Sequence, residues 1–360
     1  MADPTLKGHK LLALMPWDPP KDYLSSLLRR FPCLQVAFHK TPVAATDYDE
    51  VPAEARREVT ILVSVSCLPT LDQAPKLQYV QLMSAGAETI LNLKLFTDTN
   101  IVFCTANGVH GPQISEWVIS TFLAHQKQLP QYLEFQRKGH WQRADKREPT
   151  GISDDSVGLT VGILGYGGIG RQVARICKTM GMEIHAYTLH PRNTPESRHD
   201  RSYAPPGMGD PDGSFPSKWF AGGTKRELHE FLGSGLHVLL VSTPLTAKTK
   251  GLISQEEFKI LGKNKTFVSN ISRGAIVDTD ALFDALENDV ISGAAVDVTD
   301  PEPLPSCHKL WKAKNLIITP HVSGLSAGYL KRFLAILDLN LEKLSQGRPL
   351  MNEVSRREGY

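Results

Sequence analysis

The sequence is poor in cysteine, in long apolar runs and in net charge of either sign. Its 5 cysteines are scattered and form no CxxC pair, a pattern typical of reduced thiols and not of a secreted disulfide framework. No apolar run approaches the roughly 18 residues that span a bilayer. Proline and aspartate also interrupt the N-terminal stretch where a signal peptide would be apolar. We therefore expect a cytoplasmic protein that binds no membrane.

The charge balance argues against a general nucleic-acid binder. The 40 Lys and Arg against 38 Asp and Glu leave a formal net charge of +2, which is too small to attract a polyanion without a local patch. The motifs of metal and ATP chemistry are also missing. There is no HExxH, no paired CxxC and no GxxxxGK[ST], and Cys307-His308 has no further ligand nearby in the sequence. We expect neither a zinc alcohol dehydrogenase nor a P-loop kinase, and no bound metal.

What is present is a globular composition, with 41% hydrophobic and 22% charged residues over 360 positions. That length predicts about two domains. Short apolar runs alternate with helical segments in both halves, which predicts an α/β fold with parallel sheets. The expected strands are 11–15, 61–66, 77–83 and 101–104 in the first half, and 159–164, 182–187, 238–241, 266–269, 294–298 and 316–318 in the second.

Several connecting segments have a distinct character. Helical spacing of apolar residues predicts one long helix over about 113–136. The segment 329–344 is apolar on more than one face, which predicts a buried helix packed on the first half. The polar stretch 138–156 is interpreted as a connector or an arm reaching another subunit. The stretch 192–223 is rich in Pro, Gly and Asp and is interpreted as a surface loop or insertion.

A glycine-rich turn, GYGGIG, ends the expected strand 159–164 and opens a helix. In a dinucleotide site, Gly165 allows the tight turn, Gly167 lets the backbone approach the pyrophosphate, and Gly170 lets helix and strand pack closely. The helix N-terminus offers free N–H groups and a positive dipole end to the pyrophosphate. The context of strand, turn, helix and second strand favours a dinucleotide site over a purely structural turn. The expected cofactor-binding residues are Gly165, Tyr166, Gly167, Gly168, Ile169 and Gly170.

The end of the next strand bears on the choice between NAD and NADP. An acidic residue about 20 positions after the motif would bind the ribose 2′-OH of NAD, but Thr188 stands there. No carboxylate repels a 2′-phosphate, and His190 and Arg192 are placed to pair with one. We therefore expect a preference for NADP(H), with Thr188, His190 and Arg192 at the cofactor. The alternative is that Arg192 is a solvated charge and that NAD(H) is accepted equally.

Three charged or titratable residues follow three later strands: Arg273, Glu302 and His321. In an open parallel sheet, ligands bind outside the carboxyl ends of the strands, so these side chains can converge on one crevice. Reduction of a ketone needs a proton donor, which a histidinium can be near neutral pH. A carboxylate can orient that imidazole, and an arginine can bind a substrate carboxylate. Each residue alone has a structural interpretation, but three in this pattern favour catalysis.

Six blocks in order resemble the D-isomer-specific 2-hydroxyacid dehydrogenases over nearly the whole chain: LMSAGAE at 82–88, GYGGIG at 165–170, STPLT at 242–246, NISRG at 270–274, AAVDVTDPEPLP at 294–305 and TPHVSG at 319–324. The resemblance implies Arg273, Glu302 and His321 as the catalytic set. It also implies that Ser84, Ala85 and Gly86 bind the substrate carboxylate through backbone N–H groups, together with Arg273 and His321. Asp297 would hold the nicotinamide carboxamide, and the further cofactor contacts would be Ser242, Thr243, Pro244, Ile271 and Ser272.

The family's fold implies two doubly wound parallel-sheet domains. A Rossmann NAD(P)-binding domain over 113–324 would be inserted into a flavodoxin-like substrate domain over 1–112 and 325–360. The chain looks most like the NADPH-dependent glyoxylate and hydroxypyruvate reductases, which implies reduction of a small or larger 2-keto acid to the D-hydroxy acid. It also implies a homodimer through the cofactor domain, with Trp141 as a candidate contact. His110 and Trp117 have no assignment from the family pattern.

Two other functions occur on the same scaffold. Formate dehydrogenases carry an amide where this chain has Glu302, so the acid argues against that activity. A nucleotide-sensing corepressor or partner-binding protein stays open, because such a protein can retain the three catalytic residues. Turnover of a 2-keto acid would favour the enzyme. Silence on every keto acid, together with a partner whose binding follows NAD(P)H, would favour the sensor.

Overall fold

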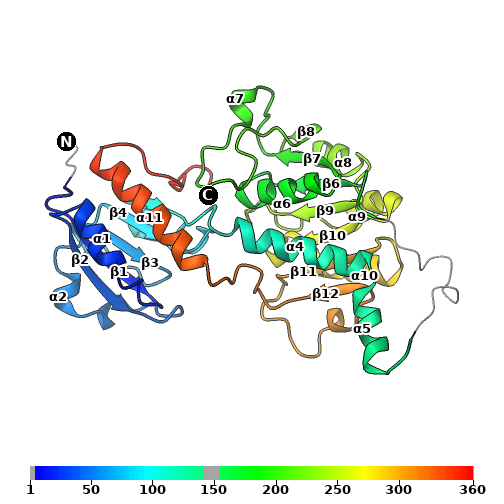
Figure 1. Cartoon of the computed structure of the whole chain (residues 1–360), viewed down its shortest axis with the longest axis horizontal. Helices are drawn as coiled ribbons and strands as arrows, with labels where there is room; N and C mark the ends of the chain where they lie inside the picture. Colours follow the sequence, from blue (N-terminus) through cyan, green and yellow to red (C-terminus); the bar gives the residue numbers. More distant parts are fainter. Residues whose placement is uncertain (1–4, 142–154, 360) are drawn as a thin grey trace. The chain divides into compact units, whose positions relative to one another are not determined.

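The computed structural model describes residues 5–141 and 155–359 of the chain. Two compact units make it up (Figure 1). Unit 1 comprises Met1–Val109 and Ser326–Tyr360, and unit 2 comprises His110–Leu325. Each unit is built on its own parallel sheet, which confirms the predicted fold class.

The sheet of unit 1 has five parallel strands in the order β2-β1-β3-β4-β5, which is the flavodoxin-like order. The strands are β1 Lys10–Met15, β2 Gln35–Lys40, β3 Ile61–Ser64, β4 Tyr79–Leu82 and β5 Val102–Cys104. The strand β2 was not predicted. It lies at an edge and its residues are half-exposed, so the mixed sequence QVAFHK lacks the apolar run that marked the central strands.

The described residues of unit 1 form four α-helices: α1 Tyr23–Arg30, α2 Ala53–Arg56, α3 Lys94–Thr97 and α11 Tyr329–Ser345. The long helix α11 packs on the sheet, as its apolar faces predict. Its fully buried Asn340 donates to Tyr79 Oη at 3.2 Å and to Gln81 Oε1 at 3.0 Å, both in β4. These bonds satisfy polar groups that would be costly to bury alone.

The sheet of unit 2 has seven parallel strands in the order β12-β11-β10-β9-β6-β7-β8, which is the Rossmann order with one strand added beyond β11. The strands are β6 Thr160–Leu164, β7 Glu183–Thr188, β8 Lys218–Ala221, β9 Val238–Val241, β10 Phe267–Asn270, β11 Gly293–Val296 and β12 Leu316–Ile318.

Helices cover both faces of that sheet (Figure 1). One hydrophobic cluster joins the sheet to α4 and α6, and a second joins it to α8, α9 and α10. The helices of unit 2 are α4 Gly111–Gln126, α5 Leu129–Arg137, α6 Gly168–Thr179, α7 Pro195–Arg198, α8 Lys225–Leu232, α9 Gln255–Leu261 and α10 Thr279–Glu287.

One prediction about unit 2 was wrong and a second was incomplete. The single helix over 113–136 is two helices, α4 and α5, because Gln128 adopts a left-handed conformation with φ +55° and ends the first. The stretch 192–223 is more than a surface loop, since it contains α7 and the edge strand β8 and buries Asp210. Of the expected arm at 138–156, residues 142–154 lie outside the described residues.

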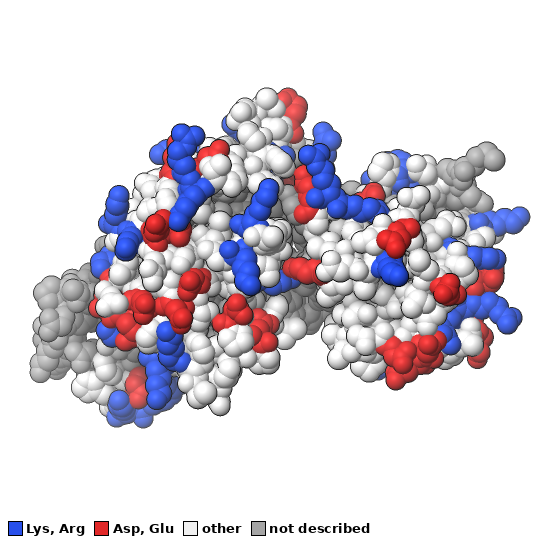
Figure 2. All heavy atoms as spheres, turned by 180° about the vertical axis from the view of Figure 1, so that it is seen from behind, with Lys and Arg blue, Asp and Glu red and all other residues white. Residues whose placement is uncertain are grey.

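The described residues include no helix that is both long enough and apolar enough to cross a bilayer. Acidic and basic side chains intermingle over the face shown in Figure 2, as the near-zero net charge leads one to expect.

Candidate active site

The glycine-rich turn between β6 and α6 is a closely packed junction. Gly165 has φ +101°, and a Cβ there would lie 2.7 Å from the Ser242 carbonyl oxygen. A Cβ on Gly170 would lie 2.6 Å from the Gly165 carbonyl oxygen. A Cβ on Gly167, in contrast, would meet nothing within 4 Å. The turn is therefore packed tightly against the sheet at Gly165 and Gly170 and leaves open space at Gly167, before the first turn of α6.

The wall opposite this turn follows β9 and β10. Ser242 Oγ donates to the Gly165 carbonyl at 2.7 Å, and Ser272 Oγ donates to the Thr243 carbonyl. Thr243 Oγ1 is buried without a hydrogen-bond partner among the described residues. Open space at Gly167 and an unsatisfied hydroxyl on the facing wall fit a dinucleotide, because its phosphates and riboses offer acceptors and donors. Pro244 is exposed beside this wall, and Ile271 is buried behind it.

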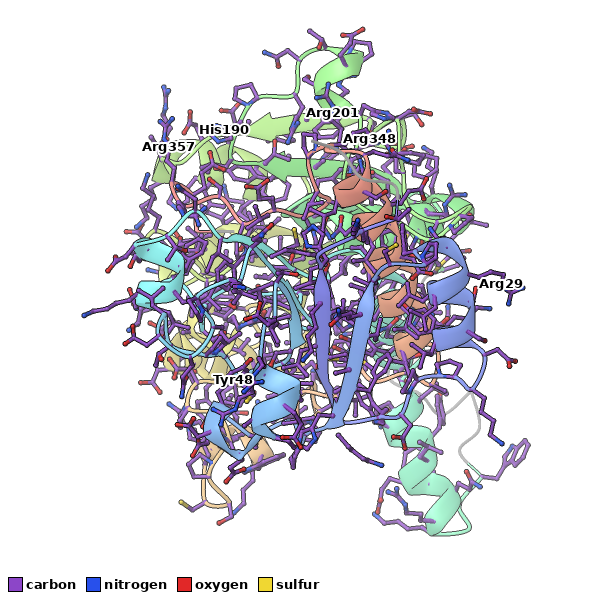
Figure 3. All side chains as sticks on the ribbon, turned by 90° about the vertical axis from the view of Figure 1, so that its left-hand side faces the viewer. Arg29, Tyr48, His190, Arg201, Arg348 and Arg357 are labelled. Carbon is purple, nitrogen blue, oxygen red and sulfur yellow. The ribbon has the colours of Figure 1, made fainter. Side chains whose placement is uncertain are left out.

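The strand β7 ends without a carboxylate. Thr188 Oγ1 donates to the His190 carbonyl at 2.8 Å, and Arg192 Nη1 donates to the Ser197 carbonyl at 2.6 Å. His190 is exposed and is labelled in Figure 3. Arg192 is half-buried. The residues expected at the adenosine ribose thus include two basic side chains and a hydroxyl.

His321 and Glu302 form a hydrogen-bonded pair in the loops after β12 and β11. His321 Nδ1 lies 2.7 Å from Glu302 Oε1, and the two side chains are 51% and 41% exposed. The second carboxylate oxygen, Oε2, accepts a long bond of 3.4 Å from the Thr299 N–H. Since Nδ1 faces the acid, Nε2 is the imidazole nitrogen left to face a substrate.

Asp297 fixes the backbone around His321. Its carboxylate is almost fully buried and accepts bonds from Thr319 Oγ1 at 2.5 Å, from the Val322 N–H at 2.9 Å and from the Ser323 N–H at 2.9 Å. His321 has φ +55°, a left-handed conformation that is unusual for a residue other than glycine. Such a conformation persists where the surroundings over-determine it, which these three bonds do.

Arg273 follows β10 and is brought next to the Glu302 loop by its neighbour Gly274. A Cβ on Gly274 would lie 2.0 Å from the Thr299 carbonyl, so the two backbones touch. Asn270 shapes the turn, accepting from the Ser272 N–H at 3.1 Å and donating to the Arg273 carbonyl at 3.1 Å. Asn270 and Gly274 were not among the predicted site residues, although both lie inside the NISRG block. A glycine directly after a charged strand-end residue was the available signal.

In unit 1, the loop Ser84, Ala85 and Gly86 leaves β4 at the carboxyl edge of its sheet. Its own polar atoms are partly used, since Ser84 Oγ donates to the Gly86 carbonyl at 2.7 Å and the Ser84 carbonyl accepts from the Ala106 N–H at 2.8 Å. Within the described part of the chain, the N–H groups of Ala85 and Gly86 make no backbone or side-chain hydrogen bond. Adjacent free N–H groups form a concavity that suits an anion such as a carboxylate.

Aromatic side chains that the sequence analysis did not single out lie beside this loop. Tyr329 Oη donates to the carbonyl of Met83, the residue before Ser84. Burial raises the pKa of Tyr329, so the phenol stays a donor. The Trp17 ring, 48% exposed, lies 5.8 Å from the Tyr329 ring. Unit 2 thus brings Arg273, Glu302, His321 and Asp297 to the ends of three neighbouring strands, while Ser84–Gly86 belong to unit 1.

Comparisons with known proteins identify the family of the chain. A family model described as the D-isomer specific 2-hydroxyacid dehydrogenase, NAD binding domain, matches residues 119–205 and 217–323. Glyoxylate reductase from Aeropyrum pernix is 30% identical over 309 residues, which cover 84% of each chain. The chain therefore belongs to the D-isomer-specific 2-hydroxyacid dehydrogenases, oxidoreductases that act on a CH–OH group.

Solved structures share the fold. A D-isomer specific 2-hydroxyacid dehydrogenase from Xanthobacter autotrophicus, in complex with NADPH and MES, has a TM-score of 0.74 at 23% identity and covers 98% of this chain and 99% of its own. An NADPH-dependent glyoxylate/hydroxypyruvate reductase from Sinorhizobium meliloti has a TM-score of 0.71 at 22% identity and covers 98% of this chain and 100% of its own. At these identities the likeness is one of fold.

Proposed function

We propose that the protein reduces a 2-keto acid to the D-2-hydroxy acid with NADPH, and that His321 is the general acid. The observation that carries the proposal is the 2.7 Å bond between His321 Nδ1 and Glu302 Oε1, in the loops after two neighbouring strands of the Rossmann sheet. That bond leaves Nε2 to give a proton to the carbonyl oxygen of the substrate. The relatives named glyoxylate reductase support a small keto acid as substrate.

Each neighbouring group has a defined part in this proposal. A nicotinamide cofactor, when bound, supplies the hydride. Glu302 orients the imidazole of His321 and stabilises its charged form. Arg273 holds the substrate carboxylate and polarises the carbonyl. In unit 1, the free N–H groups of Ala85 and Gly86 are suited to donate to a carboxylate.

The preference for NADPH rests on the end of β7. Thr188 stands at the position where an acidic residue would accept a hydrogen bond from the ribose 2′-OH of NAD, and Arg192 follows four residues later. A carboxylate there would repel a 2′-phosphate, whereas a guanidinium attracts it. Arg192→Gln should therefore raise the KM for NADPH more than that for NADH.

The test is turnover by the purified protein with NADPH and NADH over a panel of keto acids. The panel runs from glyoxylate and hydroxypyruvate through pyruvate to branched and aromatic keto acids. We expect oxidation of NADPH with at least one member, at a higher kcat/KM than with NADH. No turnover on any member, with dinucleotide still bound tightly, would reject the enzymatic proposal.

We also propose that the protein is a homodimer formed through unit 2. The helix α5 has no buried residue, and its Leu129 and Leu133 side chains are 48% and 50% exposed. Trp141, four residues after the helix, is 89% exposed. Apolar side chains this exposed on one short segment favour burial against a second copy. Light scattering after size exclusion should give twice the mass of the 39.7 kDa chain, and Leu133→Glu should lower it.

A further inference from the structure

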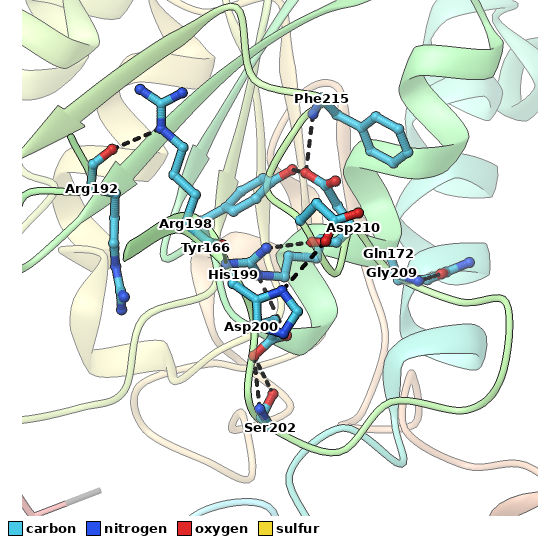
Figure 4. Close-up of polar contacts among 12 residues, drawn as sticks. Tyr166, Gln172, Arg192, Arg198, His199, Asp200, Ser202, Gly209, Asp210 and Phe215 are labelled. Carbon is cyan, nitrogen blue, oxygen red and sulfur yellow. Dashed lines mark hydrogen bonds and ion pairs between the residues drawn. The ribbon is translucent and has the colours of Figure 1, made fainter. Parts of the chain in front are cut away.

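The stretch of the chain at 206–216 is fastened to the dinucleotide turn through one buried carboxylate. Asp210 is 1% exposed, and its Oδ2 accepts from Tyr166 Oη of the glycine-rich turn at 2.7 Å (Figure 4). The N–H groups of Ser214 and Phe215 donate to the same carboxylate at 3.0 and 3.1 Å. Burial, together with the Asp210 carboxylate, raises the pKa of Tyr166, so the phenol stays a donor.

The first turns of α6 hold the same stretch by its backbone. Arg171, 4% exposed, donates to the Asp210 carbonyl, and Arg175 Nε donates to the Gly209 carbonyl at 2.7 Å. Gln172 Oε1 accepts from the Gly209 N–H at 2.7 Å. The family match is interrupted over the same stretch, since it covers 119–205 and 217–323. This attachment is therefore a feature of this chain beyond what the family model describes.

Arg171, which holds the stretch 206–216, also contacts a pair of arginines, Arg192 and Arg198, through the Arg198 carbonyl. Arg171 Nη2 donates to the Arg198 carbonyl at 2.7 Å. Arg198 Nε donates to the Arg192 carbonyl at 2.8 Å, and Arg192 Nη1 donates to the Ser197 carbonyl at 2.6 Å. We call these reciprocal contacts of Arg192, Ser197 and Arg198 the arginine clasp. Figure 4 shows the two guanidinium groups pointing away from each other, one on each side of the backbone at 192.

The clasp carries charge that the protein does not neutralise. In the part of the chain that the structure describes, no carboxylate pairs with Arg192 or Arg198. Arg198 instead lies over the Trp219 ring, with its Cζ 5.6 Å from the ring centroid. Trp219 in turn packs edge-on against Tyr166 at 5.1 Å. Both arginines are half-buried and held by neutral acceptors and a ring, which leaves guanidinium N–H groups for an outside anion.

We propose that residues 206–216 brace the arginine clasp, and that Asp210 and Arg198 are positioning residues that preset Arg192 for the 2′-phosphate of NADPH. This inference rests on the proposed preference for NADPH and assigns its structural cause. An arginine on a loose loop would lose rotamer and loop freedom on binding, and a braced one has lost it already. Asp210 acts on Tyr166 through its carboxylate and on Arg171 through its backbone carbonyl, and Arg198 acts through the Arg192 carbonyl.

The experiment measures binding of two small probes by titration calorimetry. Adenosine 2′,5′-bisphosphate carries the 2′-phosphate, and adenosine 5′-monophosphate lacks it. Asp210→Asn and Arg198→Gln should each weaken the bisphosphate by roughly two- to tenfold, the range set by ordering one or two side chains. Binding of the monophosphate should not change. In kinetics the same variants should raise the KM for NADPH and leave kcat unchanged.

Two matched controls separate bracing from general loss of charge. Asp212→Asn removes an acid two residues away that is 80% exposed. Arg201→Gln removes an exposed arginine that precedes the stretch 206–216 and is labelled in Figure 3. Neither residue touches the clasp, so both variants should bind the bisphosphate as the wild type does. Thermal unfolding checks that every variant is folded. If Asp210→Asn does not fold, Arg198→Gln carries the test.

A double variant tells positioning from direct contact. If Arg198 acts through Arg192, adding Arg198→Gln to Arg192→Gln should cost no further affinity for the bisphosphate. Fully additive losses, equal losses on both probes, or no loss in either brace variant would overturn the inference. The cofactor proposal fails on its own terms if Arg192→Gln leaves bisphosphate binding unchanged. If Arg192→Gln weakens bisphosphate binding but neither Asp210→Asn nor Arg198→Gln does, the cofactor proposal stands and only the bracing role of residues 206–216 is rejected.

Discussion

Unit 2 holds two histidine–glutamate pairs whose hydrogen bonds differ by a tenth of an ångström. His321 Nδ1 lies 2.7 Å from Glu302 Oε1, and His229 Nε2 lies 2.6 Å from Glu257 Oε1. The first pair is 51% and 41% exposed, whereas in the second the histidine is 28% and the glutamate 4% exposed. The bond alone therefore cannot say which pair takes part in chemistry.

The surroundings of the second pair explain what it does. His229 belongs to α8 and Glu257 to α9, so their bond ties two helices on one face of the sheet. Glu257 Oε2 also accepts from the Ser254 N–H at 3.0 Å and completes the N-terminal capping box of α9. The Lys225 ammonium lies 2.5 Å from Glu256 and 3.9 Å from Glu257. Lys225 supplies the positive charge beside this cluster of one histidine and two acids, so the cluster joins α8 to α9.

The surroundings of the first pair differ in kind. His321 and Glu302 sit in loops beyond the carboxyl ends of β12 and β11. Glu302 accepts from the Thr299 N–H of its own loop, and the loop of His321 is held by the Asp297 carboxylate through the Val322 N–H. Nothing there completes a helix cap. A pair that is well oriented, exposed and located where parallel sheets bind ligands is available for proton transfer. Substitutions in the two pairs should therefore separate activity from stability.

The largest expected effect is that of His321→Gln. Without the imidazole no group donates the proton, so kcat for reduction of the best keto acid should fall by about 10²–10⁴-fold. Steady-state kinetics with NADPH give the value, and the melting temperature should stay near that of the wild type. The matched variant His229→Gln should keep kcat within twofold. Turnover near normal in His321→Gln would remove this histidine from the mechanism.

Next in size is Glu302→Gln. The amide can still accept a hydrogen bond but no longer stabilises a charged imidazole, so kcat should fall by about tenfold or more. The KM for NADPH should change little, because the carboxylate acts on His321 and not on the dinucleotide. An unchanged kcat would show that the imidazole needs no acid partner and would make the first pair no more than a loop contact.

The strand-end residues could be predicted because their signal is local. A short apolar run followed by Arg273, Glu302 or His321 is visible in one dimension, and parallel sheets gather such ends at one edge. The Rossmann strands β6, β9 and β12 and the helix α11 were equally visible from apolar patterning. The second pair was not predicted, since His229 and Glu257 sit in amphipathic helices where a polar residue is ordinary.

Other features could not be predicted, because they depend on contacts distant in the sequence. The edge strand β8 is four residues long and partly exposed, so the sequence KWFA was lost within a loop rich in Pro and Gly. Asp210 is an acid between Gly209 and Pro211, which is a turn signal, and its burial against Tyr166 appears only when residues 44 apart meet. The break at Gln128, in contrast, did have a local signal, since Pro130 lies in the first turn of α5.

A stability effect of intermediate size is expected for Glu257→Gln. Its carboxylate is buried and accepts bonds from His229 and Ser254, and an amide can keep only part of that pattern. The free energy of unfolding should fall by about 1–3 kcal/mol, the cost of leaving a buried polar group unsatisfied. Denaturation by urea measures it, and kcat should stay within twofold. A loss of activity at full stability would contradict the structural assignment of the second pair.

The smallest expected effect concerns His125, a histidine that has no carboxylate partner in the described residues and stacks on Phe267 at 4.8 Å. Burial lowers the pKa of His125 below its ordinary value of 6.5. The unfolded chain therefore takes up a proton near pH 6.5 that the folded protein still refuses, and it binds more protons as the pH falls. Linkage then requires the free energy of unfolding to have its full value above pH 6.5 and to decrease as the pH drops below 6.5. Burial also lowers the pKa of His185, which adds to the slope in the same direction.

Urea denaturation between pH 7 and pH 5 should show this decline in the free energy of unfolding, and His125→Gln should make the decline shallower. An equal slope in the variant would mean that the buried ring takes up its proton as readily as a solvated one.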